Sequence, residues 1–197
     1  MSPVKPPRPA GPPPDQGALH EAALSHLARY ATTQAGLRRV LERRVDRWAR
    51  LAAEGAEPEA IRAQVAAAKR AASEVVVRLA EAGAVNDAAF AASRARSLAR
   101  AGRSRRAIAA HLGSKGVDAD LARDAVPDDA ETELAAALIL ARRRRIGPFR
   151  VGEPLDESGR RRALAAFARA GFSQAIAVRA LAMEPEEAEA LVIALRR

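Results

Sequence analysis

Apolar residues recur at helical spacing along most of the chain. In the segment 33–53, Leu37, Leu41, Val45 and Trp48 form one stripe, and arginines fill a different one. Positions three or four residues apart share a face of an α-helix, because the helix has about 3.6 residues per turn. The pattern therefore predicts an amphipathic helix whose apolar face, including Trp48, lies in the core.

The predicted helices are separated by a joint that recurs in one form. A glycine is followed by an apolar residue and then by a polar cap, as in Gly83-Ala84-Val85-Asn86-Asp87, Gly116-Val117-Asp118 and Gly171-Phe172-Ser173. Glycine supplies the left-handed residue that ends a helix, the apolar residue packs back, and Asp or Ser caps the next helix. Three copies of one joint predict an internal repeat.

Two further alignments support the repeat. Thr33 and Ser104 are each followed by apolar residues four and eight positions later, and 71 residues separate the two. The segment 104–126 also resembles 162–181, at a spacing of about 55 residues with one gap.

The pattern predicts an all-α protein of three tandem three-helix units in an elongated, curved array, behind a disordered Pro-rich tail. The expected parts are the tail 1–17, repeat 1 at 18–83, repeat 2 at 84–126, and repeat 3 at 127–197 with a C-terminal helix. The helices are expected at 18–30, 33–53, 58–82, 87–101, 104–115, 118–125, 128–145, 157–170, 173–182 and 185–196. The Pro- and Gly-rich segment 147–154 is expected to be an exposed loop.

Composition agrees with this fold class. Hydrophobic residues make up 49% of the chain but are mostly alanine, with four Phe, one Tyr and one Trp, and alanine favours helices over strands. There is no cysteine, which excludes disulfides and thiolate chemistry. Neither a membrane-spanning stretch nor an apolar signal region is visible, so we expect a cytoplasmic protein that does not contact a membrane.

A catalytic or metal site is not predicted. His20, His26 and His111 lack partners at ligand spacing, and the segment Gly113-Ser114-Lys115-Gly116 lacks the complete pattern of a phosphate loop. The carboxylates near positions 128–133 and 184–189 open predicted helices, where the helix dipole favours negative charge. We therefore expect no enzyme activity, no cofactor and no metal.

The basic residues are the remaining candidates for function. Thirty-three Lys and Arg against 24 Asp and Glu give a net charge of +9, which favours phosphate backbones or acidic protein surfaces. A GC-rich genome could also enrich arginine, and cations at the end of a helix could simply complement its dipole. With few aromatics, bases could not be stacked in series, so recognition by shape and charge is expected. The candidate residues are Arg38, Arg39, Arg43, Arg44 and Arg47; Arg94, Arg96, Arg100, Arg103, Arg105, Arg106 and Lys115; and Arg142, Arg143, Arg144 and Arg145.

Several of these segments resemble the RecX family of bacterial regulatory proteins, which modulate the RecA recombinase. The resemblance is carried by the segments 79–91, 103–112 and 115–117, which hold the joint after Gly83 and the Arg-rich helix that follows Arg103. The segments 143–150 and 168–173 resemble the third-repeat signature of the alphaproteobacterial members. In the first unit, Tyr30-Ala31-Thr32-Thr33 replaces the commoner "R-xx-S" joint.

The resemblance implies tandem three-helix repeats that lie in the groove of the RecA–DNA filament. It also implies inhibition of ATP hydrolysis, strand exchange and co-protease activity by RecA. We expect a monomer that binds single- and double-stranded DNA more weakly and without sequence specificity. The alternative is a general DNA-binding protein that acts on naked DNA through a helix-turn-helix within 104–126.

Overall fold

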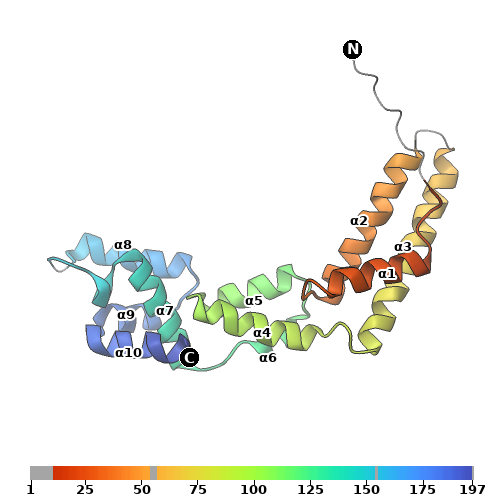
Figure 1. Cartoon of the computed structure of the whole chain (residues 1–197). Helices are drawn as coiled ribbons and strands as arrows, with labels where there is room; N and C mark the ends of the chain where they lie inside the picture. Colours follow the sequence, from red (N-terminus) through yellow and green to blue (C-terminus); the bar gives the residue numbers. More distant parts are fainter. Residues whose placement is uncertain (1–10, 54–56, 154, 197) are drawn as a thin grey trace, which may run out of the picture. The chain divides into compact units, whose positions relative to one another are not determined.

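The computed structural model describes residues 11–53, 57–153 and 155–196, and their secondary structure is entirely helical (Figure 1). The all-α prediction is confirmed. Of the predicted tail, positions 1–10 lie outside the described residues, 11–15 are non-helical, and the first helix already begins at Gln16. The helices are α1 (Gln16–Leu27), α2 (Gln34–Ala52), α3 (Pro58–Glu81), α4 (Asp87–Arg100), α5 (Arg105–Ser114), α6 (Ala119–Ala125), α7 (Ala130–Arg144), η1 (Gly147–Phe149), α8 (Glu157–Arg169), α9 (Gln174–Ala182) and α10 (Pro185–Arg196).

The chain forms two compact units, and the first ends at Asp87. In this unit α2 and α3 pack side by side, and α1 packs on both (Figure 1). Leu37, Leu41 and Val45 are fully buried, as the sequence predicts. The core of the unit consists of Leu19, Ala23, Leu37, Leu41, Val45, Ala68, Ala72, Val75, Val76, Leu79 and Val85.

The second unit begins at Ala88 and contains two hydrophobic clusters. The smaller cluster joins α4, α5 and α6 through residues such as Ala95, Ile108 and Leu112. The larger one joins α7 to α9 and α10 and includes Leu138 and Phe167. The predicted repeat boundaries and the curved array stay predictions.

The glycine joints form as the sequence indicates. Gly83, Gly116 and Gly171 have φ values of 73°, 83° and 89°, in the left-handed region. In each joint the next residue donates its backbone N–H to a carbonyl five residues earlier, which satisfies a free acceptor at the helix end. Asp118 and Ser173 cap the following helices, as predicted.

Two expectations about individual positions are wrong. Trp48 is only half-buried, and its Nε1 donates a hydrogen bond of 2.8 Å to the backbone oxygen of Gly11. The segment predicted as an exposed loop ends at position 154, which lies outside the described residues; within 147–153, Gly147–Phe149 form a 3-10 helix and Phe149 packs against the larger cluster. In both cases a contact distant in sequence decides how far the side chain is buried.

The joint between α4 and α5, residues 101–104, packs closely against the C-terminal half of the second unit. Gly102 has a φ of 78°, and a Cβ atom there would lie 2.7 Å from Ile139 Cγ2. Ser104 is fully buried; its Oγ accepts a hydrogen bond from Ala107 N–H and donates one of 2.6 Å to the backbone oxygen of Ala170. A glycine and a small hydroxyl residue are therefore required at these positions.

Gly102→Ala should destabilise the second unit, whereas Gly113→Ala should stabilise it. The first substitution combines left-handed strain with overlap against Ile139 and should cost about 2 kcal/mol or more. Gly113 lies in α5 with nothing within 4 Å of its Cβ position, so alanine should add about 0.5–1 kcal/mol through helix propensity. Calorimetric unfolding of both variants measures the difference, and equal effects would contradict the close approach at Gly102.

Candidate binding surfaces

The five candidate arginines of α2 are all exposed, but they divide into two groups. Arg43, Arg44 and Arg47 line a groove of about 400 Å³ between α1 and α2, together with Arg29, which follows the end of α1. Arg38 and Arg39 precede them on α2 and do not line the groove. The first unit therefore holds a concave basic surface within the predicted cluster.

The positive charge of this groove is largely uncompensated by acidic residues near α2. Asp46 pairs with Lys69 of α3 at 2.7 Å, and among the residues that line the groove Glu21 is the acidic one. Arg43 and Arg47 have no ion pair with any carboxylate in the described part of the chain. Their charges are therefore available to an external anion.

In the second unit, three candidates gather around His111. Arg94 Nε donates a hydrogen bond of 3.2 Å to His111 Nε2, and burial, followed by the charges of Arg94, Lys115 and Arg103, lowers the pKa of His111. The imidazole is consequently kept neutral and accepts the bond from Arg94. Arg96 and Arg100, also candidates, are exposed on α4.

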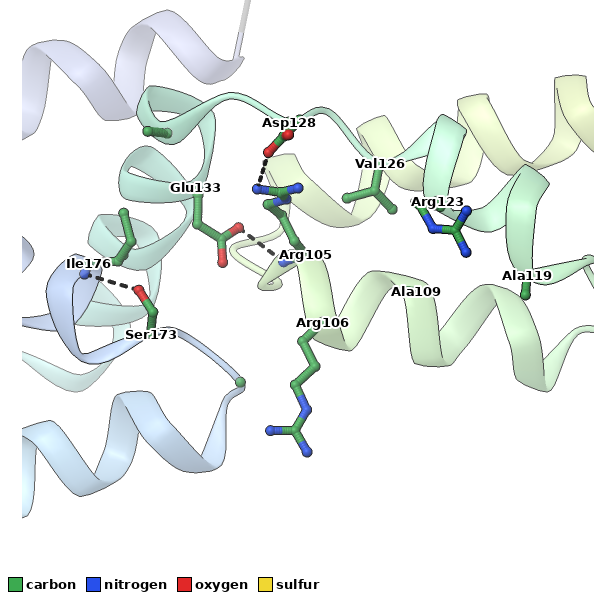
Figure 2. Close-up of a pocket in the computed structure, with 12 residues that line it drawn as sticks. Arg105, Arg106, Ala109, Ala119, Arg123, Val126, Asp128, Glu133, Ser173 and Ile176 are labelled. Carbon is green, nitrogen blue, oxygen red and sulfur yellow. Dashed lines mark hydrogen bonds and ion pairs between the residues drawn. The ribbon is translucent and has the colours of Figure 1, made fainter.

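Arg105 and Arg106 are neighbours with different roles. They line a groove of about 630 Å³ between α5 and α6 on one side and α7 and α9 on the other (Figure 2). Arg105 Nη1 forms an ion pair with Asp128 at 2.5 Å, so its charge is used inside the unit. The Arg106 side chain points away from this ion pair and is exposed (Figure 2).

One carboxylate, predicted to stabilise its own helix, contacts the N-terminus of another helix. Glu133, in the first turns of α7, accepts a hydrogen bond of 3.0 Å from the backbone N–H of Arg105, the first residue of α5. In the first unit, Asp87 accepts one of 2.8 Å from the N–H of Gln34, the first residue of α2. Asp87 is itself the first residue of α4, so a carboxylate at the joint after Gly83 serves the N-terminus of α2.

The run Arg142 to Arg145 does not present four equivalent charges. Arg142 forms an ion pair with Glu189, and its guanidinium lies 5.1 Å from the centroid of the Phe149 ring. Arg143 Nη1 donates a hydrogen bond of 3.1 Å to the backbone oxygen of Ala101. Arg144 and Arg145 remain exposed, and Arg145 ends the helix in the left-handed conformation with a φ of 52°. Two of the four arginines thus hold the second unit together.

Comparison with known proteins decides the family. A family description of the second three-helix domain of RecX matches residues 86–126, which contain α4, α5 and α6. The Regulatory protein RecX of Myxococcus xanthus (strain DK1622) is 43% identical over 169 residues, which cover 85% of this chain and 86% of the relative. The chain belongs to the RecX family.

A second RecX relative covers a shorter part. The Regulatory protein RecX of Agrobacterium fabrum (strain C58) is 42% identical over 106 residues, which cover 54% of this chain and 56% of the relative. RecX proteins carry a regulatory name, so a regulatory role is the function that family membership supports. Within the described residues, no helix is long and apolar enough to cross a membrane.

Replacement of Glu133 by glutamine should preserve or increase stability near neutral pH. Burial raises the pKa of Glu133, against the opposing effects of the Arg105 N–H and the Arg105 charge, so ionisation costs folding free energy. The unfolded chain loses this proton first as the pH rises, and the wild type therefore loses stability above the ordinary glutamate pKa. Glutamine keeps an oxygen for the Arg105 N–H without the charge.

The matched variant is Glu133→Ala, which removes the acceptor and should cost about 1 kcal/mol. Denaturant unfolding across a pH series measures both variants. The difference between Glu133→Gln and the wild type should vanish below the ordinary glutamate pKa. A glutamine variant that is less stable than the wild type at neutral pH would show that the carboxylate charge is favourable here.

Arg145→Gly should stabilise the second unit by about 0.5–1 kcal/mol. Glycine removes the left-handed strain at this position, which outweighs the larger entropy that glycine loses on folding. Arg144→Gly is the control, because Arg144 is helical and the same substitution there should destabilise. Calorimetry of the two variants tests the opposite signs, and a loss of stability in both would show that the Arg145 side chain makes a stabilising contact.

Proposed function

We propose that this chain binds the RecA–DNA filament and mostly inhibits ATP hydrolysis, strand exchange and co-protease activity by RecA. The proposal places it in the cytoplasm as a monomer without enzyme activity. Family membership supports a regulatory role, and RecA is the partner that the RecX resemblance implies. Binding would favour one state of the filament, because a ligand shifts an equilibrium only through differential affinity.

The observation that carries the proposal is the set of exposed arginines that remains once the arginines engaged in internal contacts are left out. Arg105, Arg142 and Arg143 are engaged inside the second unit. Arginines that are exposed and have no ion pair with a described carboxylate remain on both units, among them Arg38, Arg43, Arg44, Arg47, Arg96, Arg100, Arg106 and Arg144. Arginine suits both phosphates and carboxylates, which a nucleoprotein filament offers together.

The alternative is binding to naked DNA through a helix-turn-helix formed by α5 and α6. These two helices pack on each other, and a short joint at Gly116 connects them. This reading predicts tight and steeply salt-dependent DNA binding without RecA. RecA regulation predicts weaker DNA binding and a large gain in affinity from the filament.

The test is ATP hydrolysis by RecA of the same organism on single-stranded DNA, titrated with this protein at substoichiometric ratios. The wild type should inhibit, and excess single-stranded DNA should not relieve the inhibition. The variant Arg96→Ala/Arg100→Ala/Arg106→Ala should need about ten-fold more protein for the same inhibition, since three charged contacts are lost.

A matched control removes the same charge from exposed residues of α8 in the same unit. The triple variant Arg160→Ala/Arg162→Ala/Arg169→Ala should inhibit nearly as well as the wild type. If excess DNA abolishes the inhibition, the protein competes for free DNA, and the naked-DNA alternative is correct. If both triple variants lose inhibition equally, net charge rather than the proposed surface is responsible.

A further inference from the structure

We infer that the groove between α1 and α2 binds the backbone of a single-stranded nucleic acid, and that Tyr30 stacks on one unpaired base at its margin. The inference deepens the proposed function and rests on it, because the proposed nucleoprotein partner contains the nucleic acid that the groove would bind. It adds a site on the first unit and a preference between single and double strands. Its test contains no RecA, so the two proposals can fail separately.

The charge of the groove fits a polyanion. Arg29 contributes from the turn after α1, and Arg43, Arg44 and Arg47 contribute from α2, with Glu21 as the acidic residue of the lining. Arg43 and Arg47 are one turn apart on α2, a rise of about 6 Å, so both can contact the same strand. Arg29 is held in place by a hydrogen bond of 3.2 Å from its Nε to the backbone oxygen of Ser25.

Tyr30 supplies the second, independent feature. Tyr30 is 57% exposed, and every other phenyl, phenol or indole ring in the described residues is buried or half-buried. Its ring centroid lies 5.2 Å from that of His26 and 5.9 Å from the guanidinium carbon of Arg29. His26 and Arg29 both line the groove, so the phenol ring lies at its margin.

The combination selects a single strand over a duplex. An exposed aromatic ring can stack on a base only if that base is unpaired and turned outward, whereas the bases of a duplex are stacked on one another. Arginines that contact the backbone carry no such preference. Tyr30 therefore provides strand selectivity, and the groove arginines provide affinity.

An acidic protein segment is the competing occupant of the groove. It would also be attracted by Arg43, Arg44 and Arg47, but it offers no nucleobase to Tyr30. Weaker binding to a single strand on removal of the Tyr30 ring is therefore the observation that separates the two occupants.

The experiment measures fluorescence anisotropy of a labelled oligothymidylate and of a labelled duplex of equal length, with the full chain and over a salt series. Tyr30→Ala should weaken binding to the single strand about five-fold or more, leave duplex binding unchanged and leave the salt dependence unchanged. Tyr30→Trp keeps an aromatic surface and should retain the single-strand affinity.

The groove variant Arg43→Ala/Arg44→Ala/Arg47→Ala tests the electrostatic part. It should weaken binding to the oligothymidylate and reduce the slope of log K against log salt by about 2, since each phosphate contact on a single strand contributes about 0.7. The matched control Arg62→Ala/Arg70→Ala/Arg78→Ala removes three exposed arginines of α3 in the same unit. The control should change the slope much less, and circular dichroism checks that each variant is folded.

Three results would overturn the inference. The first is absence of single-strand binding by the wild type. The second is an equal loss of affinity for single strand and duplex in Tyr30→Ala. The third is an equal loss of single-strand affinity and salt dependence in the α3 and groove variants. If the groove variants lose DNA binding but the wild type fails to inhibit RecA, the groove is confirmed and the proposed regulation is wrong. If the wild type inhibits RecA but substitutions at Tyr30 and in the groove leave DNA binding unchanged, the proposed regulation is supported and the groove inference is wrong.

Discussion

The second unit depends on how closely the backbone of the joint 101–104 approaches α7 and the end of α8. A glycine in the left-handed conformation, Gly102, allows the joint to lie against Ile139. Ser104 is buried with its hydrogen bonds satisfied, because its hydroxyl both accepts from the Ala107 N–H and donates to the Ala170 carbonyl. A buried polar group costs free energy unless it is hydrogen-bonded, so these two bonds make the burial possible. The joint thereby connects α5 to the C-terminus of α8 and to α7.

This packing also determines how the charges near the joint are used. Glu133 satisfies the Arg105 N–H, Asp128 neutralises the Arg105 side chain, and Arg143 donates to the Ala101 carbonyl. Free N–H groups at helix N-termini and free carbonyls at their ends need such partners when helices pack together. Part of the arginine content therefore serves internal packing, and only the remainder is available to a partner.

The exposed arginines lie on different surfaces, and the proposed RecA regulation and the proposed single-strand site use different ones. Exposed arginines on α4 and α5 can contact a nucleoprotein partner through charge, which is tolerant of sequence and sensitive to salt. The α1–α2 groove adds concavity and one exposed aromatic ring, at Tyr30, which charge alone does not provide. Under the two proposals, this chain with few aromatics would recognise a single strand at one position and contact a charged partner surface elsewhere.

The sequence by itself determined the helices, the glycine joints and the buried stripe through Leu37, Leu41 and Val45, because helix periodicity, capping and termination are properties of neighbouring residues. It also determined the family, through the motifs around the joint after Gly83. Only the tertiary structure decided that Trp48 bonds to Gly11 outside the core, that Asp87 and Glu133 serve other helices, and which arginines are already paired. Those outcomes depend on partners tens of residues away, and the identity of an arginine is the same whether its guanidinium meets a carboxylate, a carbonyl or solvent.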